Sequence, residues 1–414
     1  MRLVINKNKI FNFLFITTLL TDAYCFTTLG NRNITLFYPI VFFLFFLSLV
    51  LNNKLILSSI SENVFAFLMI VYMPLNYIIN GGESSTLMIS LILWCLYVFS
   101  YRKISVVSFY RFIQLYQSVI NITVVYGIYQ FFAHALNLPL ADIFIDGHMS
   151  VGYNWGNDIS ILGLVLRRSN AIFREPSFFS QFIGVNVLIY IQHLLDNPRQ
   201  KSRKEYIWLS LNILAMVLSF SGTGILILVG GFVCLLLFNN HRKIGLYIRK
   251  HKRIILVLTV VFVMVFLTPN PLRNYFFSRF AEFDSTNVES ISAYIRFVKP
   301  YEATIEILKN QPWLGLGLGK TYNYSTTITG NLNNALSVAL PRSFAELGII
   351  GGVIYVCFMI KGIKKNNLKY GPYKAFLIGA YIMTFMHGTW SSEIYWLFLS
   401  AINIDIISKG ENLK

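Results

Sequence analysis

Two short stretches of the chain place an arginine and a glutamate at the start of an apolar run. In FREPSFFS, Arg174 and Glu175 precede Pro176, a residue that suits the first turn of a helix. In PRSFAEL, Arg342 stands a comparable distance before the apolar run that starts at Phe344. A guanidinium group bonds phosphate oxygens two at a time. The two arginines therefore suit the binding of phosphate groups at helix starts.

The composition shows that these apolar runs belong to a membrane protein. Hydrophobic residues make up 55% of the chain and charged residues only 13%, far from the values of a soluble domain. A helix that crosses a bilayer needs about 20 apolar residues. We therefore predict an all-α polytopic membrane protein with about twelve transmembrane helices, in a range of roughly 10–14. The predicted spans are 10–29, 33–51, 62–80, 84–101, 113–136, 177–195, 206–221, 223–239, 254–268, 344–361, 375–389 and 393–408.

The net charge of +17 mostly reflects topology. The first span follows MRLVINKNK without a cleavage site, which predicts an uncleaved segment and a cytoplasmic N-terminus. Most of the 35 lysines and arginines then fall on alternate short segments, as expected of cytoplasmic loops. This topology also places the C-terminus in the cytoplasm. No basic, water-exposed domain remains, so no nucleic-acid partner is expected.

The chain offers no pattern for a metal or a cofactor. Its four cysteines, at positions 25, 95, 234 and 357, fall inside predicted spans, where a small buried hydrophobe is the ordinary role. It contains no Asp-x-Asp, no Walker loop and no Gly-x-Ser-x-Gly. We therefore expect neither a metal site nor a cofactor.

Two long segments lie outside the spans on the side opposite the basic loops, and loops of such length tend to carry function. We expect both to carry short amphipathic helices. In the second, SISAYIRFVKPYEATIEILKN has apolar residues at helical spacing, which predicts an amphipathic helix kinked at Pro300. The following QPWLGLGLGK has no strand before it, so we predict a tight turn near the bilayer and no nucleotide loop. The predicted divisions are N-terminal helices (1–136), an outer loop (137–176), central helices (177–268), a large outer loop (269–343) and C-terminal helices (344–414).

Five stretches, taken in order, resemble the O-antigen polymerase (Wzy-type) family of the wider O-antigen ligase/polymerase superfamily. They are FREPSFFS, SFSGTGILILV, SRFAEFDSTNVESISAYIRF, QPWLGLGLG and FAELGIIGG. The resemblance covers most of the chain. It implies a GT-C-like glycosyltransferase in the inner membrane of a bacterium, with its active site on the periplasmic face. Such an enzyme transfers a growing glycan from undecaprenyl diphosphate to a sugar hydroxyl of a new lipid-linked repeat unit.

The resemblance implies a role for each matching residue. A lipid diphosphate is already a good leaving group, so fixed arginines can stabilise its charge without a metal. The residues expected to bind diphosphate are Arg174, Arg296, Arg342 and, in support, Arg279. The sugar hydroxyl needs a proton acceptor, for which Glu175 and Glu346 are the candidates, with Glu175 ahead because Arg174 neighbours it. Glu346 equally suits an acid in a first helical turn, favoured by the helix dipole.

Three alternatives stay open. Ligase relatives, which transfer the glycan to lipid A core, carry a histidine before the motif glutamate, at a position that falls near Ser337 here. A flippase for the same lipid-linked unit would need a charged cavity within the spans and short loops. A solute transporter would predict internal repeats with broken helices. The expected partners are the undecaprenyl-diphosphate-linked donor and acceptor, membrane lipid and a protein that regulates chain length.

Overall fold

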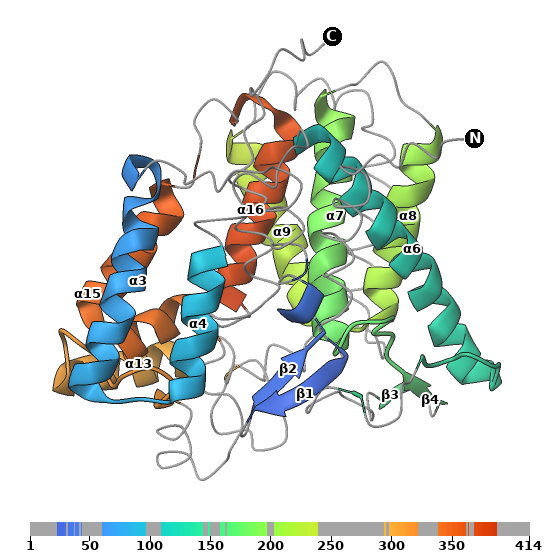
Figure 1. Cartoon of the computed structure of the whole chain (residues 1–414). Coiled ribbons are helices and arrows are strands. Elements are labelled where there is room, and N and C mark those ends of the chain that lie inside the picture. The colour runs from blue at the N-terminus through green and yellow to red at the C-terminus, as the bar shows by residue number, and fades with distance from the viewer. Residues whose placement is uncertain are drawn as a thin grey trace, which may run out of the picture.

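The computed structural model is a bundle of helices with two small β-hairpins at one end (Figure 1). It describes residues 23–29, 32–36, 38–40, 43, 60–96, 109–143, 148–149, 158–161, 164–196, 203–238, 294, 298–321, 338–361, 363 and 368–386. Within these residues, three helices are long and apolar enough to cross a membrane, namely Phe112–Leu136, Pro176–Asp196 and Ala339–Lys361. The helical, membrane-type fold is confirmed, and the number of about twelve spans stays a prediction.

Most described helices coincide with predicted spans. The helices are α3 (Ile60–Asn80), α4 (Ser84–Leu96), α6 (Phe109–Leu136), α7 (Pro176–Asp196), α8 (Arg203–Leu218), α9 (Gly222–Phe238), α13 (Lys299–Asn310), α15 (Ala339–Lys361) and α16 (Gly371–Met386). Helix α15 begins before the predicted boundary at 343, so Arg342 lies within the helix. The predicted spans 254–268 and 393–408 lie outside the described residues.

The helix α13 is the amphipathic helix expected in the large loop. It begins at Lys299, with Pro300 in its first turn, where a proline removes no helical hydrogen bond. Residues 289–293 and 295–297, which would precede the kink, lie outside the described residues, so the predicted kink at Pro300 stays a prediction. The buried residues of α13, Pro300, Thr304 and Ile307, lie on one face. Beside its start, the Tyr294 hydroxyl donates to Glu302 Oε2 at 2.6 Å, and this bond raises the pKa of the Tyr294 hydroxyl.

Two short hairpins depart from the all-α prediction. Strands β1 (Cys25–Leu29) and β2 (Arg32–Thr35) pair antiparallel where the sequence predicted helical spans over 10–29 and 33–51. That prediction is wrong for these residues. Threonine and isoleucine favour strands, and a glycine–asparagine pair connects them. Strands β3 (Asp158–Ile161) and β4 (Leu164–Arg167) form the second hairpin, within the loop before α7.

Helix α7 lies at the centre of the bundle, against α6, α8, α9 and α16 (Figure 1). Nearly all of its residues are buried. Small residues allow α9 to approach it closely, because a Cβ at Gly224 would meet the backbone of Ser180 and one at Gly231 would overlap Leu188. Such close packing through small residues is typical of membrane helices. The core therefore fixes the position of α7 along the bundle axis and its rotation, and so also the position of its first turn.

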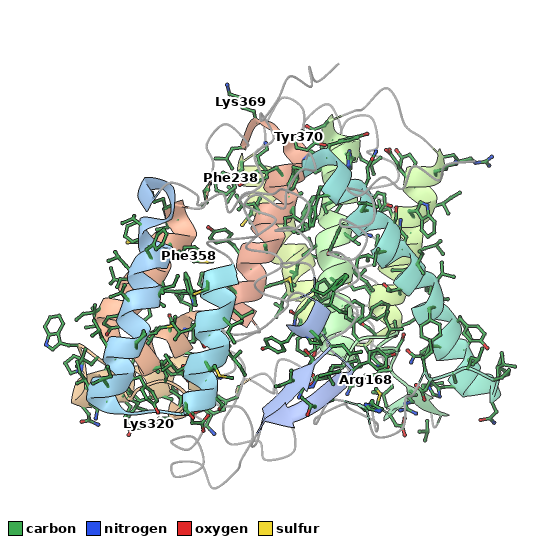
Figure 2. All side chains as sticks on the ribbon, viewed as in Figure 1. Arg168, Phe238, Lys320, Phe358, Lys369 and Tyr370 are labelled. Atoms are coloured by element: carbon green, nitrogen blue, oxygen red, sulfur yellow. The ribbon has the colours of Figure 1, made fainter. Side chains whose placement is uncertain are left out.

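The helices alternate in direction, so the molecule has two distinct ends. Lys320 and Arg168 lie at one end and Lys369 and Tyr370 at the other, which we call the Lys320 end and the Lys369 end (Figure 2). Helices α3, α6 and α8 finish at the Lys320 end, and α4, α7, α9 and α15 begin there (Figure 1). This alternation agrees with the order of spans predicted from the sequence. The membrane side that each end faces stays a prediction.

Candidate functional site

The first part of the site is built on a break in α15. Gly348 has φ 68° and ψ −171°, which no helical residue adopts, so α15 consists of two helical segments that meet at this glycine. A positive φ of this kind is readily adopted only by glycine. A Cβ at Gly348 would also overlap the carbonyl group of Trp313. The sequence ELGIIGG therefore breaks a helix that its hydropathy alone predicts as continuous.

The glycine-rich turn after α13 replaces the hydrogen bonds that this break removes. Gly315, Gly317 and Gly319 of the turn all have positive φ. Leu316 N donates to Ala345 O at 2.9 Å, and Gly317 N donates to Glu346 O at 3.0 Å.

On the other side of the break, Ile349 N donates to Pro312 O at 2.9 Å and Ile350 N to Trp313 O at 3.4 Å. In an unbroken helix these two N–H groups would bond Ala345 and Glu346. Backbone groups of a membrane helix must find partners within the protein. The QPWLGLGLGK segment is thus the structural complement of the break and forms a tight turn, as predicted. Its predicted location near the bilayer stays a prediction.

Arg342 and Glu346 lie one helical turn apart in the first segment of α15 and form an ion pair. Arg342 Nε lies 2.7 Å from Glu346 Oε1, and the hydroxyl of Thr321 donates to the same oxygen at 2.7 Å. Glu346 is fully buried, while 12% of the Arg342 side chain is exposed. The carboxylate therefore holds the guanidinium group from the protein side and leaves part of Arg342 accessible.

Helices α13 and α3 hold the segments around this ion pair. From α13, the Thr304 hydroxyl donates to Pro341 O at 3.0 Å. From α3, the Tyr72 hydroxyl donates to Leu347 O and the Asn76 amide to Leu314 O, both at 2.7 Å. Lys320 Nζ donates to the carbonyl oxygen of Asn80. The position of Arg342 thus depends on segments that are far apart in the sequence.

The second part of the site is the start of α7. The carbonyl oxygen of Glu175 accepts hydrogen bonds from Phe178 N at 3.1 Å and Phe179 N at 3.2 Å, so Glu175 begins the helix. The Ser177 hydroxyl donates to Glu175 Oε2 at 2.9 Å. Arg174 and Glu175 are both partly exposed, beside a buried first helical turn. The helix dipole at such a start favours anions.

Buried hydroxyl groups join this start to α9. Thr223 Oγ1 donates to Ser177 O at 3.2 Å, and its hydroxyl also lies 3.2 Å from Ser180 Oγ and 2.9 Å from Ser221 Oγ. These residues belong to the FREPSFFS and SFSGTGILILV stretches. The two stretches therefore form one polar contact, at the starts of α7 and α9.

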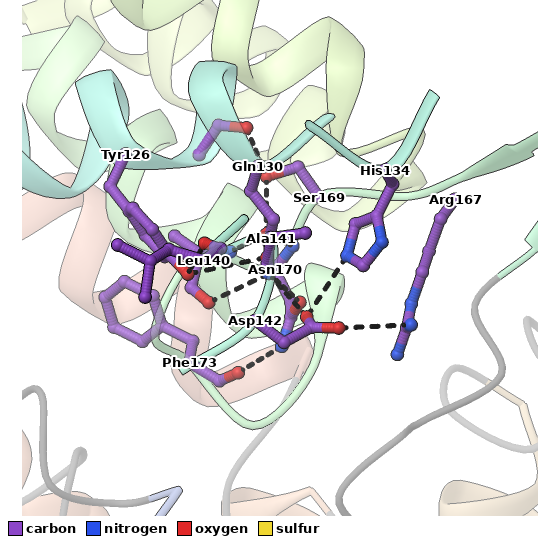
Figure 3. Close-up of polar contacts among 12 residues, drawn as sticks. Tyr126, Gln130, His134, Leu140, Ala141, Asp142, Arg167, Ser169, Asn170 and Phe173 are labelled. Carbon is purple, nitrogen blue, oxygen red and sulfur yellow. Dashed lines mark hydrogen bonds and ion pairs between the residues drawn. The ribbon is translucent and has the colours of Figure 1, made fainter. Parts of the chain in front are cut away.

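A buried polar network holds the turn before Arg174 (Figure 3). Gln130 of α6 bonds Ser169, Asn170 and Ala171 in this turn. Asp142 accepts a hydrogen bond from Gln130 Nε2 at 3.1 Å. The other Asp142 contacts are His134 Nε2 at 3.1 Å and Arg167 Nη1 at 3.2 Å. Sequence reasoning did not find this network, because its members come from three separate segments.

The structure places four of the six predicted site residues. Arg174 and Glu175 lie at the start of α7, and Arg342 and Glu346 form the ion pair of α15. The starts of α7 and α15, to which the two pairs belong, both lie at the Lys320 end of the molecule (Figure 1). Arg279 and Arg296 lie outside the described residues. Thr321 was missed, although it directly follows the glycine-rich turn.

Within the part of the chain that the structure describes, no three His, Cys, Asp or Glu side chains are grouped so as to hold a metal ion. The expectation of metal-independent chemistry stays a prediction. The charged groups that the described site presents are arginines and glutamates.

Part of the chain matches a known protein family. Residues 207–356 match the family model described as O-antigen ligase, which confirms the resemblance to the O-antigen ligase/polymerase superfamily. The match includes α8, α9, α13 and the first part of α15, with Thr321, Arg342 and Glu346. Arg174 and Glu175 lie outside the matched segment. No curated protein matches the chain.

Proposed function

We propose that this chain, whose residues 207–356 carry the features of the O-antigen ligase/polymerase superfamily, is the polymerase of a bacterial surface polysaccharide. It transfers a growing glycan from undecaprenyl diphosphate to a sugar hydroxyl of the next lipid-linked repeat unit. The observation that carries this proposal is the buried Glu346, which holds Arg342 at the Lys320 end, where Arg174 also lies. A preorganised arginine of this kind stabilises a diphosphate leaving group.

In this reaction a bond forms between the acceptor oxygen and the anomeric carbon of the donor glycan, and the bond from that carbon to the diphosphate breaks. We assign Arg342 and Arg174 to the diphosphate oxygens. The ion pair with Glu346 uses Nε of Arg342, so its two Nη groups are the atoms assigned to phosphate. Arg296 would bind the same diphosphate, and Arg279 would support them or bind the acceptor.

We assign to Glu175 the role of general base, which accepts the proton of the acceptor sugar hydroxyl. A general base must come within hydrogen-bond reach of the hydroxyl that it deprotonates. Glu175 is partly exposed, and its Oε2 accepts from Ser177. Glu346 is fully buried, and its Oε1 accepts from Arg342 and Thr321. We therefore propose that Glu346 positions Arg342 and that Glu175 receives the proton.

The main alternative is a ligase, which would use the same donor and transfer the glycan to lipid A core. The residue near which the ligase histidine would fall is Ser337, and no histidine occurs anywhere between 269 and 343. This favours the polymerase. A flippase or another transporter has less support, because the family match belongs to glycosyltransferase-like enzymes.

The proposed location is the inner membrane, with both termini in the cytoplasm and the Lys320 end in the periplasm. Donor and acceptor lipids would enter the site from the bilayer. A protein that regulates chain length is a further proposed partner, and no cofactor is required by this mechanism.

The test is the ladder of surface glycans from cells that lack the native gene and carry wild type, Arg174→Ala or Arg203→Ala. The exposed Arg203, at the start of α8 at the opposite end, is the matched control. We expect the deletion and Arg174→Ala to give core with a single repeat unit, and Arg203→Ala to give the full ladder at equal membrane levels. Loss of the single-unit band in the deletion would contradict the polymerase and point to a ligase or flippase. A full ladder from Arg174→Ala would remove Arg174 from the mechanism.

A further inference from the structure

Gln130 makes an unusually complete set of hydrogen bonds for a side chain on a membrane helix. It lies near the end of α6 and is only 1% exposed. Its Oε1 accepts from Ala171 N at 2.7 Å, from Asn170 N at 3.1 Å and from Ser169 Oγ at 3.1 Å. Its Nε2 lies 3.1 Å from Asp142 Oδ1, 3.2 Å from Asn170 Oδ1 and 3.3 Å from Ala171 O. A buried amide this fully bonded specifies the geometry around it.

These bonds hold a strained turn, residues 169–173. Ala171 has φ 49°, a conformation that residues other than glycine rarely adopt, so the surrounding contacts must stabilise it. Within the turn, Asn170 Nδ2 donates to Phe173 O at 2.6 Å (Figure 3). The ring of Phe173 stacks on Phe182 of α7, with centroids 4.9 Å apart. The residue that follows Phe173 is Arg174.

Asp142 determines which way the Gln130 amide faces. A carboxylate only accepts hydrogen bonds, so the Nε2 group of Gln130 must face Asp142 and Oε1 must face the N–H groups of the turn. His134 and Arg167 in turn hold Asp142 (Figure 3). The order of contacts therefore runs from Asp142 through Gln130 to the 169–173 turn and Arg174.

We propose that Gln130 is a positioning residue of the glycosyl-transfer site, which fixes Arg174 and Glu175 relative to α6 by holding the 169–173 turn. The inference rests on the proposed function, because it takes Arg174 to bind the diphosphate. It adds α6 and the Asp142 network to the machinery, although neither lies in the segment that matches the family. A small displacement of a catalytic group lowers turnover steeply, by up to ~100-fold for about 1 Å.

The first test compares Gln130→Leu with Gln117→Leu in the purified full chain in lipid nanodiscs. The substrate is the pool of lipid-linked repeat units extracted from cells that lack the native gene. Gln117 lies on the same helix, and its buried Nε2 has no hydrogen-bond partner among the described residues, which makes it the matched control. We expect kcat to fall by ~10- to 100-fold for Gln130→Leu, with a smaller change in KM, and to stay within about twofold for Gln117→Leu.

The second test uses the direction of the hydrogen bonds. Gln130→Glu places a second carboxylate against Asp142, so we expect this variant to be less active than wild type. Its activity relative to wild type should rise as the pH falls, because the new carboxyl group gains a proton and can donate to Asp142. The double variant Gln130→Glu/Asp142→Asn restores a donor opposite an acceptor, so we expect it to recover activity at least threefold over Gln130→Glu. A role in stability alone would not produce this pH dependence at equal protein level.

The outcomes separate this inference from the proposed function. Wild-type kcat in Gln130→Leu, together with an inactive Arg174→Ala, overturns the role of Gln130 and leaves the polymerase proposal standing. Wild-type kcat in Arg174→Ala overturns the assignment on which both rest. If Gln130→Leu does not reach the membrane, the Gln130→Glu variant decides the inference. The inference is overturned if the activity of Gln130→Glu relative to wild type does not change with pH and the double variant recovers no activity.

Discussion

At the scale of single residues, the burial of Glu346 favours the proposal that it holds Arg342 over the prediction that it accepts the proton. A carboxylate that accepts from Arg342 and Thr321 while fully buried suits the holding of a cation. A proton acceptor would need contact with the acceptor sugar. Holding Arg342 and accepting the proton both require a glutamate at this position of the ELGIIG motif. The two roles differ in what the carboxylate oxygens contact.

The positioning role predicts different results for two substitutions of Glu346. Glu346→Gln keeps a carbonyl oxygen that accepts from Arg342 and Thr321, so we expect a shortened but visible glycan ladder. Glu346→Leu leaves the Arg342 charge without its partner, at a cost of ~3–5 kcal/mol, so we expect little protein in the membrane. Blotting and the glycan ladder measure both, with the exposed Glu306→Gln as control. A fully expressed Glu346→Gln that makes no polymer would instead indicate that Glu346 is the base.

Gly348 predicts a second residue-scale result. Gly348→Ala forces a Cβ into the Trp313 carbonyl and imposes an unfavourable φ, which by itself costs about 1–3 kcal/mol. We expect a clearly lower unfolding temperature in detergent and a weakened ladder. The control is Gly222→Ala, because a Cβ there meets no atom within 4 Å. Equal unfolding temperatures for the two variants would show that the break in α15 is not required.

At the scale of elements, three asparagines join α6, α7 and α8 within the bundle. Asn186 Nδ2 lies 2.9 Å from Asn212 Oδ1 and 3.2 Å from Asn121 Oδ1, and Asn212 Nδ2 lies 3.0 Å from Asn121 Oδ1. All three are buried. Such bonds between membrane helices contribute about 0.6–2 kcal/mol each. The cluster therefore fixes α7 against its neighbours, at a distance along the helix from its functional first turn.

We expect Asn212→Leu to lower the free energy of unfolding by about 1–2 kcal/mol, because the other two asparagines lose a partner in an apolar environment. Ser210→Leu, on the exposed face of the same helix, should change it little. Denaturant unfolding of the purified protein measures both. An Asn212→Leu variant as stable as Ser210→Leu would mean that packing alone holds α8.

At the scale of the whole molecule, the two ends differ in their structural elements and in their charged residues. The Lys320 end holds the two hairpins and the starts of α7 and α15, to which the two arginine–glutamate pairs belong (Figure 1). The Lys369 end carries basic residues such as Arg203, Lys369 and Lys374. The positive-inside rule predicts that the Lys369 end faces the cytoplasm. The proposed chemistry would then take place on the other side of the membrane.

This orientation predicts a labelling result in a variant whose four native cysteines are replaced. Trp313→Cys, at a side chain that is 64% exposed at the Lys320 end, should react with a membrane-impermeant maleimide in spheroplasts. Arg203→Cys should react only after lysis. The reverse pattern would place the proposed site in the cytoplasm and contradict the mechanism.

The sequence by itself determined the class of protein and most helix positions, because hydrophobic runs of membrane length have few alternatives in a bilayer. It also determined the candidate arginines and glutamates, whose types follow from the chemistry of phosphate and hydroxyl groups. It misplaced residues 25–29 and 33–35, since local hydropathy does not distinguish a short strand from the edge of a span.

Only the tertiary structure decided how the site is held. The break at Gly348 is stable because a turn some 30 residues earlier supplies the missing backbone partners, and no local pattern in ELGIIGG specifies that turn. Gln130, Asp142 and Asn170 likewise meet only once α6 and the loop before α7 have folded. Hydrogen bonds between distant segments depend on where these segments lie in space. The sequence therefore predicted the types of the candidate groups, and the tertiary structure determined how they are held.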